Sequence, residues 1–398
     1  MANAGWTDLD SLRDEELLRA KEVQSKYEQP NGSVGLLAGG TENWQDVSAN
    51  DVDRYGFIVK RNGARARFEN SPMSLKAILR PSNKKLRAPQ IVGLAAEPNT
   101  QREVIRQMKW SQMAKRAVDT NTGVVTYSFT RSEKLVERTF KGIPDAWRAA
   151  AWRAFLTDSA KLKPEFLPDA RLEELYPQYL AQPSPYDSQI DLDVPRTIDS
   201  HVMFSARYRG GQRLLFRVLH AFSTHFDEIG YVQGMAPLAA TFLSYYDEVA
   251  CFIMMVRLFS TRHMDKLYAH GFGGLMLAFE DLSKTLNKRK VGRTLNKLAI
   301  EPTLYATKWY LTLFSYSVPF STRLRIWDVF FLLGDKDLSI VHSAALTLVD
   351  SMRESLVSAD FESAMGLVSH YVDVQNDDLF MNVLEYEYHY LSTRSNTI

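Results

Sequence analysis

Residues 190–197 read Ile-Asp-Leu-Asp-Val-Pro-Arg-Thr, and residues 230–235 read Gly-Tyr-Val-Gln-Gly-Met. Between them, apolar residues recur at the three- and four-residue spacing of a single buried helix face, at Leu215, Val218, Leu219, Phe222, Phe226 and Ile229. The glycines at 210–211 mark the start of this helix, and Gly230 is placed for a left-handed cap at its end. The sequence therefore predicts an arginine and a glutamine in short loops at the two ends of one rigid helix.

The chemistry of these two side chains suits contact with phosphate oxygens and with a water molecule. Pro195 fixes its own backbone and disfavours a helical conformation at Val194, so Arg196 is expected to leave a stiff, extended segment. Its guanidinium is permanently charged and matches phosphate oxygens. The amide of Gln233 both donates and accepts hydrogen bonds, as orienting a water molecule requires. A structural explanation stays open for each: Arg196 pairs with a nearby carboxylate, and Gln233 caps a helix.

Taken together, the two stretches resemble paired motifs of the TBC domain, the Rab GTPase-activating module. The first motif has the form I-x-x-D-x-x-R-T and is matched by Ile190, Asp193, Arg196 and Thr197. The second is matched by Tyr231, Gln233, Gly234 and Met235, while Val232 and Ala236 replace a cysteine and an asparagine that are usual there. Elements that resemble the start and the later part of the domain are Arg138, residues 141–144, Arg148, Trp152, residues 309–314, Arg325, Trp327 and Asp328.

The resemblance, which covers roughly residues 100–390, implies a fold and its boundaries. The expected class is all-α: a two-lobed, V-shaped TBC helical domain at residues 101–390, with a C-terminal tail at 391–398. Residues 1–100 are expected to form a partly irregular, partly flexible extension. Trp327 is expected in the core, and Asp328 either bonds the backbone or holds an arginine near the active face.

By the same resemblance, the chain is expected to stimulate GTP hydrolysis by a GTP-bound Rab-family GTPase and so to regulate vesicle traffic. Arg196 would be the arginine finger and Gln233 the amide that orients water, with Asp193 holding the arginine. The residues expected to support the site or contact the Rab are Ile190, Asp193, Thr197, Tyr231, Gly234, Met235, Arg325, Trp327 and Asp328. The partner would hold GTP and Mg²⁺, so no cofactor is expected here. The alternatives are a catalytically inactive TBC scaffold and a helical adaptor.

Composition and motif searches exclude several other classes of function. The net charge of the 398 residues is +1, which does not favour binding to nucleic acid. We find no P-loop, no metal-ligand spacing and no nucleophile elbow, so the chain is expected to have no metal site and no hydrolase site of its own. The single cysteine and the polar, acidic start fit a cytoplasmic protein. The apolar run 235–259 is interrupted by acids at 247 and 248, which favours buried helices over a membrane span.

Four further expectations concern the first part of the chain. Between Lys60 and Arg87, nine basic residues face one acid, which indicates either a solvated linker or a contact with an anionic membrane. The membrane contact would be peripheral, on an endomembrane or the plasma membrane. Residues 51–58 are expected to be ordered against the main domain. A helix is expected at 103–113, with Val104 and Met108 on its apolar side, and a strand too isolated to build a sheet at 123–127.

Overall fold

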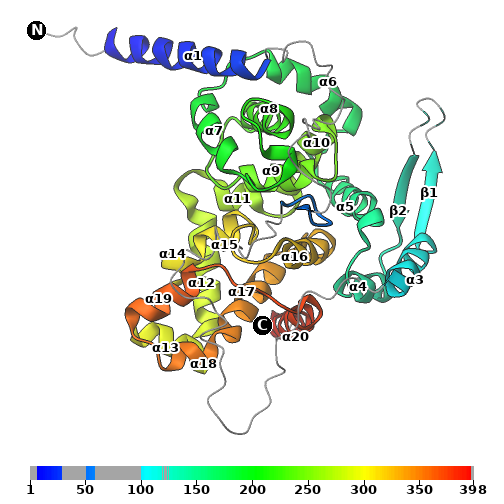
Figure 1. Cartoon of the computed structure of the whole chain (residues 1–398), viewed down its shortest axis with the longest axis vertical. Coiled ribbons are helices and arrows are strands. Elements are labelled where there is room, and N and C mark those ends of the chain that lie inside the picture. Colours follow the sequence, from blue (N-terminus) through cyan, green and yellow to red (C-terminus); the bar gives the residue numbers. More distant parts are fainter. Residues whose placement is uncertain are drawn as a thin grey trace, which may run out of the picture. The chain divides into compact units, whose positions relative to one another are not determined.

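The structure, a computed structural model, describes residues 7–28, 51–58, 100–118, 120, 123 and 125–395. These residues are mostly helical (Figure 1), so the predicted all-α class is confirmed. Their internal contacts divide the chain into unit 1, which contains residues 1–66 and 167–256, and unit 2, which contains residues 67–166 and 257–398. The basic run 60–87 and the C-terminal residues 396–398 lie outside the described residues.

Unit 1 is built around one helix, α8, which packs against α1, α6, α7 and α9. The elements of this unit are α1 (Thr7–Glu28), α6 (Asp169–Leu180), α7 (Asp187–Asp193), the 3₁₀ helices η3 (Val194–Arg196) and η4 (Val202–Phe204), α8 (Gly210–His225), α9 (Ala236–Leu243) and the first part of α10 (Glu248–Thr261). The apolar face predicted for α8 is buried, including Leu215, Val218, Leu219 and Phe222. Its burial explains why a helix with charged residues on its other side is stable.

Helix α8 ends earlier than its sequence pattern predicts. Phe226 leaves the helical conformation, with φ of −108° and ψ of 64°. The backbone N–H groups of Ile229 and Gly230 then both donate to the carbonyl of Phe226, at 3.0 and 2.7 Å. Phe226 and Ile229 therefore continue the apolar spacing in a turn, because a compact turn and a helix can both direct side chains to the same core. Gly230 ends this turn and does not cap the helix.

The extended conformation predicted for Val194, two residues before Arg196, is also wrong. Val194 is helical, with φ of −50° and ψ of −51°, although a proline follows it. It continues α7 into η3, and the carbonyl of Val194 accepts from the N–H of Thr197 at 3.2 Å. The steric preference before proline is a bias, and burial of Val194 and Asp193 against unit 1 overrides it here. The extended conformation begins one residue after the arginine, at Thr197.

Unit 2 contains a two-stranded hairpin followed by a larger set of helices. Its elements are α3 (Thr100–Ser111), β1 (Ala114–Val118), β2 (Val125–Phe129), α4 (Glu133–Phe140), α5 (Asp145–Ala160), α11 (Met264–Tyr268), η5 (His270–Phe272), α12 (Gly273–Leu286), α13 (Lys290–Lys297), α14 (Pro302–Tyr305), α15 (Thr307–Leu311), α16 (Phe320–Leu333), α17 (Ser339–Ser351), α18 (Arg353–Val357), α19 (Phe361–Ser369) and α20 (Asp377–Ser395). Helix α16 packs against α4, α5, α17 and α20.

Two predictions for the start of unit 2 need correction. The strand near residue 125 is not isolated, because β2 pairs antiparallel with β1, with Ala114 opposite Phe129. Helix α3 does not bury Val104 and Met108, which are both exposed; its buried anchor is Trp110, whose ring meets that of Phe129 at 5.5 Å. One large aromatic side chain therefore outweighs the periodic aliphatic residues in orienting this helix.

A buried carboxylate joins α16 to the segment that begins α5. Asp328 accepts from Nε of Arg148 at 3.0 Å, from the indole N–H of Trp152 at 2.8 Å and from the backbone N–H of Ile143 at 3.2 Å. Burying a charge is costly unless it is paired and hydrogen-bonded, and here Asp328 meets both conditions. The residues that resemble the start and the later part of a TBC domain are thus joined directly.

Asp328→Ala should lower the free energy of unfolding by about 3–5 kcal/mol, because it removes a buried carboxylate and leaves the buried Arg148 with Asp145 as its remaining ion-pair partner. Urea denaturation followed by circular dichroism measures this loss. The matched control is Asp281→Ala, which removes an exposed ion pair with Lys284 and should cost about 0–1 kcal/mol. Equal stabilities of the two variants would contradict a structural role for the buried carboxylate.

Candidate functional site

Arg196 is the last residue of η3 and presents an exposed side chain from a rigid base. Its Nε donates to the carbonyl of Leu192 at 2.7 Å, and its Nη2 lies 3.5 Å from Oδ1 of Asp193. The side chain is nevertheless 65% exposed, whereas that of Asp193 is 7% exposed. The arginine is therefore oriented by one short hydrogen bond while most of its guanidinium faces solvent.

Gln233 lies in the turn between α8 and α9. Gly230, with φ of 63°, lies three residues before Gln233, and a Cβ atom there would lie 2.0 Å from the ring of Tyr186, so only glycine fits. Gly234 is also left-handed, with φ of 114°. Gln233 itself is exposed, and its amide makes no hydrogen bond within the described part of the chain. This amide is free to bind a ligand or a water molecule.

One carboxylate connects the arginine to the glutamine turn. Asp193 faces Arg196 through Oδ1, and its Oδ2 accepts from the hydroxyl of the buried Tyr231 at 2.8 Å. Tyr231 is two residues before Gln233, and Asp193 is three residues before Arg196. Consecutive Cα atoms are about 3.8 Å apart, so this bridge keeps the two exposed side chains in one region of unit 1.

The remaining motif residues in unit 1 hold the two loops. The hydroxyl of Thr197 donates to the carbonyl of Asp193 at 2.8 Å and so closes η3. Ile190 and Met235 are buried, and the N–H of Met235 donates to the carbonyl of Val232 at 3.2 Å. None of these three can offer much surface to a partner, so their contribution is to shape the loops. Ala236 is buried too, at the first position of α9.

The start of α7 is attached to α8 by a buried pair. Asp187 and Nδ1 of His220 lie 2.6 Å apart, and the backbone N–H of Ser184 approaches the other carboxylate oxygen at 3.3 Å. Burial raises the pKa of Asp187, although the contact with His220 favours its charged form. Both ends of α7 are thus fixed by aspartates, Asp187 at the first residue and Asp193 at the last.

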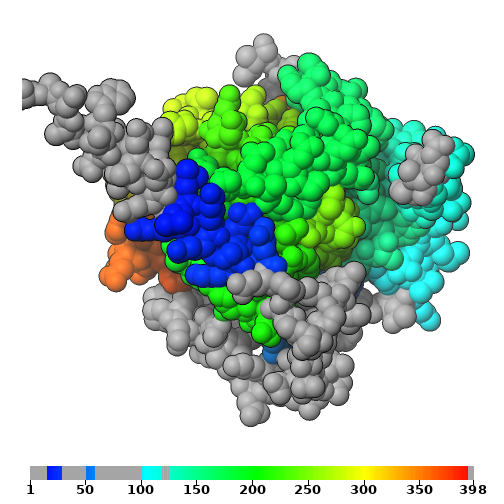
Figure 2. All heavy atoms as spheres, turned by 90° about the horizontal axis from the view of Figure 1, so that it is seen from above, coloured from blue at the N-terminus to red at the C-terminus, as the bar shows by residue number. Residues whose placement is uncertain are grey.

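Sequence reasoning missed the contribution of α1 to this site. The hydroxyl of the buried Tyr27 donates to Oδ1 of Asp191 in α7 at 2.7 Å, and Arg207 reaches the same oxygen at 2.7 Å. The ring of Tyr27 stacks on Phe216 of α8 at 3.9 Å between centroids. Figure 2 shows α1, in blue, lying against the green residues of unit 1. Helix α1 therefore helps to hold α7, the helix that leads to Arg196. A single tyrosine in a charged helix has no sequence pattern from which this contact could be predicted.

Residues 51–58 contact the chain just after Arg196. This contact confirms the prediction that residues 51–58 are ordered against the main domain. The N–H of Ile58 donates to the carbonyl of Ser200 at 2.9 Å, and the N–H of Val202 donates to that of Gly56 at 3.0 Å. Nε2 of His201 lies 2.8 Å from the carbonyl of Tyr55. Residues 7–28 and 51–58 of the predicted extension are thus integral parts of unit 1.

Three predicted supporting residues belong to unit 2. Trp327 is buried, and its indole N–H donates to the carbonyl of Leu313 at 3.0 Å. Asp328 is buried in the contacts described above, so no partner protein reaches either side chain. Arg325 bonds Asp378 at 2.6 Å and the carbonyl of Phe140 at 2.8 Å. All three hold unit 2 together.

Two absences limit the chemistry of the described residues. No group of three His, Cys, Asp or Glu side chains within them is arranged to hold a metal ion. No helix among them combines the length and the hydropathy of a membrane span. What unit 1 offers is an exposed cation, Arg196, held by a short hydrogen bond to the carbonyl of Leu192, and an exposed amide, Gln233, that makes no hydrogen bond within the described residues.

Two solved structures have a fold similar to that of this chain. The Ypt/Rab-GAP domain of Gyp1p matches with a TM-score of 0.57 and 16% identity, over 73% of this chain and 99% of that one. The flagellar RabGAP TBC domain of Chlamydomonas matches with a TM-score of 0.55 and 24% identity, over 72% of this chain and 91% of that one. At these identities the match concerns the fold, which is that of a TBC domain.

Sequence comparison identifies the family. The model of the Rab-GTPase-TBC domain matches residues 145–357, which include Arg196 and Gln233. A TBC domain-containing protein of Schizosaccharomyces pombe is 45% identical over 283 residues, 70% of this chain and 66% of that protein. The Rab GTPase-activating protein tbc-11 of Caenorhabditis elegans is 30% identical over 237 residues, 59% of this chain and 25% of that protein. The chain belongs to the Rab-GTPase-TBC domain family, and it spans less than two thirds of these two relatives.

Tyr27→Ala should loosen the arginine loop without unfolding the chain. Loss of a buried aromatic ring costs about 3–5 kcal/mol, which is enough to detach α1 from α7 and α8. Amide hydrogen exchange of residues 187–197, read by mass spectrometry, should become faster. The control is Glu22→Ala, an exposed change on the same helix, which should leave the exchange unchanged. Unchanged exchange in Tyr27→Ala would show that α7 holds its conformation without α1.

Proposed function

We propose that this protein activates GTP hydrolysis by a Rab-family small GTPase in its GTP-bound form, with Arg196 and Gln233 acting in trans. The observation that carries the proposal is the Asp193 bridge, which joins the arginine loop to the glutamine turn through Tyr231. Two exposed polar side chains held in this way suit insertion into the nucleotide site of another protein. Membership of the family supports the same function.

Arg196 would act on charge that develops on the transferred phosphoryl group. The partner holds GTP and Mg²⁺, and a positioned arginine adds about 10³–10⁵ in rate, or about 4–7 kcal/mol of barrier. The ion pair that Arg196 makes at 3.5 Å with Asp193 is exposed on the arginine side and contributes about 0–1 kcal/mol. The guanidinium can therefore exchange this contact for phosphate oxygens at little cost.

Gln233 would orient the attacking water molecule. Its free amide has an N–H₂ group to direct at an oxygen and a carbonyl to accept from water. The left-handed glycines on both sides of the turn fix the backbone from which the amide projects. A rigid backbone matters because positioning, rather than covalent chemistry, supplies most of the catalysis in phosphoryl transfer.

A Rab substrate implies a role in vesicle traffic, a cytoplasmic location and peripheral contact with endomembrane or plasma membrane. The chain itself would need no cofactor. The alternative is a TBC scaffold that binds a GTPase without activating it. The replacements Val232 and Ala236 in the second motif are the reason to test this alternative. Ala236 is buried, so the change from asparagine at that position affects packing of the turn and leaves the exposed amide of Gln233 in place.

Arg196→Ala should reduce stimulated hydrolysis by about 10³–10⁵ while Rab binding is largely kept, because the finger acts chiefly on the transition state. Arg196→Lys should also fail, since an ammonium lacks the planar fork. Single-turnover GTP hydrolysis at saturating protein, across a panel of Rabs, measures both. The control is Arg171→Ala, an exposed arginine on α6. Stimulation by Arg196→Ala equal to that of the unaltered protein would leave the scaffold as the function.

Gln233→Ala should also lose most of the stimulation, with an unchanged melting temperature, because its side chain makes no contact that stabilises the fold. Gln178→Ala, an exposed change on α6, is the matched control. The double variant with Arg196→Ala should be little worse than either single variant, since both groups serve one transition state. A full additive loss in the same single-turnover assay would separate the two roles.

A further inference from the structure

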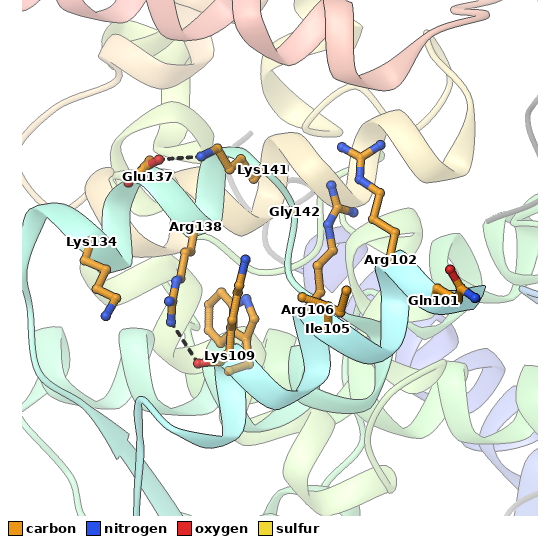
Figure 3. Close-up of a pocket in the computed structure, with 11 residues that line it drawn as sticks. Gln101, Arg102, Ile105, Arg106, Lys109, Lys134, Glu137, Arg138, Lys141 and Gly142 are labelled. Carbon is orange, nitrogen blue, oxygen red and sulfur yellow. Dashed lines mark hydrogen bonds and ion pairs between the residues drawn. The ribbon is translucent and has the colours of Figure 1, made fainter. Parts of the chain in front are cut away.

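A pocket of about 520 Å³ opens on unit 2, on a face formed by α3 and α4. Its lining residues all belong to unit 2, whereas Arg196 and Gln233 belong to unit 1. Figure 3 shows the side chains that line it, with those of α3 along one side and those of α4 along the other. Its volume is within the range of about 300–1,000 Å³ that is usual for small-ligand sites.

The lining is strongly basic. Six cationic side chains and one acidic side chain, Glu137, face this pocket; the cations are Arg102, Arg106, Lys109, Lys134, Arg138 and Lys141. Lys141 pairs with Glu137, and Arg102 pairs with Asp378 at 3.2 Å. The other four cations make no ion pair with any described residue. Within the described residues, the charges of these four side chains are therefore left without an ion-pair partner.

One arginine of the pocket, Arg138, is held by a hydrogen bond, and a second, Arg106, is half-buried. Nη1 of Arg138 donates to the backbone carbonyl of Lys109 at 2.8 Å, which ties α4 to α3 across the pocket (Figure 3). Arg106 is half-buried beside Arg102 and Arg325. Burial lowers the pKa of Arg106, and the like charges of these two neighbours lower it further, against the opposing effect of Asp378 and Glu103. An anion in the pocket would relieve this crowding.

Exposed apolar side chains lie on α3, the helix that forms one side of the pocket. Val104, Ile105 and Met108 are 49%, 51% and 59% exposed on α3, and Ile105 also lines the pocket. Apolar side chains placed between basic ones are the pattern of segments that lie at a membrane interface, with cations at the headgroups and apolar groups in the acyl boundary. A soluble phosphate compound would use the cations and leave these three residues in water.

We infer that this pocket binds the phosphate groups of a polyphosphorylated membrane lipid, with Val104, Ile105 and Met108 inserted beside the headgroup. The arginine forks suit bidentate contact with phosphate, and the lysines add charge attraction. This inference gives a site to the peripheral membrane contact proposed above, and rests on that part of the proposed function. It is independent of the reaction at Arg196 and Gln233.

The test is vesicle flotation of the full chain without any Rab, so that its failure and a failure of GTPase activation are seen separately. Phosphatidylcholine vesicles carry either phosphatidylinositol bisphosphate or, at the same total charge, phosphatidylserine. Lys109→Gln with Lys134→Gln removes two exposed, unpaired pocket cations. Ile105→Ser with Met108→Ser removes two of the three exposed apolar side chains of α3. Lys284→Gln with Lys290→Gln is the control, which removes the same charge from exposed positions of unit 2 outside the pocket.

We expect the pocket variant to bind the phosphoinositide vesicles about 30-fold more weakly, or about 2 kcal/mol at 1.4 kcal/mol per decade. The control variant should bind as the unaltered protein does. The apolar variant should bind the vesicles more weakly but retain binding of soluble inositol trisphosphate, measured by calorimetry.

Three results would overturn the inference. Equal losses in the pocket and control variants would mean that only net charge matters. Equal binding to the phosphatidylserine vesicles would exclude headgroup recognition. Binding of inositol trisphosphate at the pocket without any binding to vesicles would assign the site to a soluble phosphate ligand.

Discussion

The hydrogen bond from Tyr231 to Asp193 is the contact on which the candidate site depends. A buried carboxylate needs partners on both of its oxygens, and Asp193 takes one from each motif loop. The same group thus offsets its own burial and brings together two segments separated by α8. Asp328 does the equivalent in unit 2, where it joins α16 to the start of α5. In both units a buried aspartate connects segments that are far apart in the sequence.

Much of this arrangement could be predicted from the sequence, because the motifs and the apolar face of α8 are local patterns. Arg196 and Gln233 were found as motif residues, and the helical class followed from periodicity and resemblance. Local rules failed where distant contacts decide the outcome. Val194 is helical before a proline because the core buries it, and α3 is oriented by Trp110 instead of by its aliphatic residues.

The parts of the site that could not be predicted come from residues with no pattern of their own. Tyr27 is one aromatic residue in a charged helix. Its ring stacks on α8, and its hydroxyl donates a hydrogen bond to α7. The pocket on α3 and α4 has no sequence pattern either, because its cations are spread over two helices. They form a cluster in the folded chain, where Arg138 donates to the carbonyl of Lys109. Proximity of this kind exists only after folding.

The contacts of Tyr27 and of residues 51–58 with the arginine loop decide which fragments of the chain retain the support of that loop. A fragment limited to the family match, residues 145–357, would contain both motif side chains but neither N-terminal support. Its arginine would project from a less ordered loop, and preorganisation is a large part of what such a residue contributes. A chain shortened to these residues would therefore keep the two motif side chains and lose the contacts of Tyr27 and of residues 51–58 that support the arginine loop.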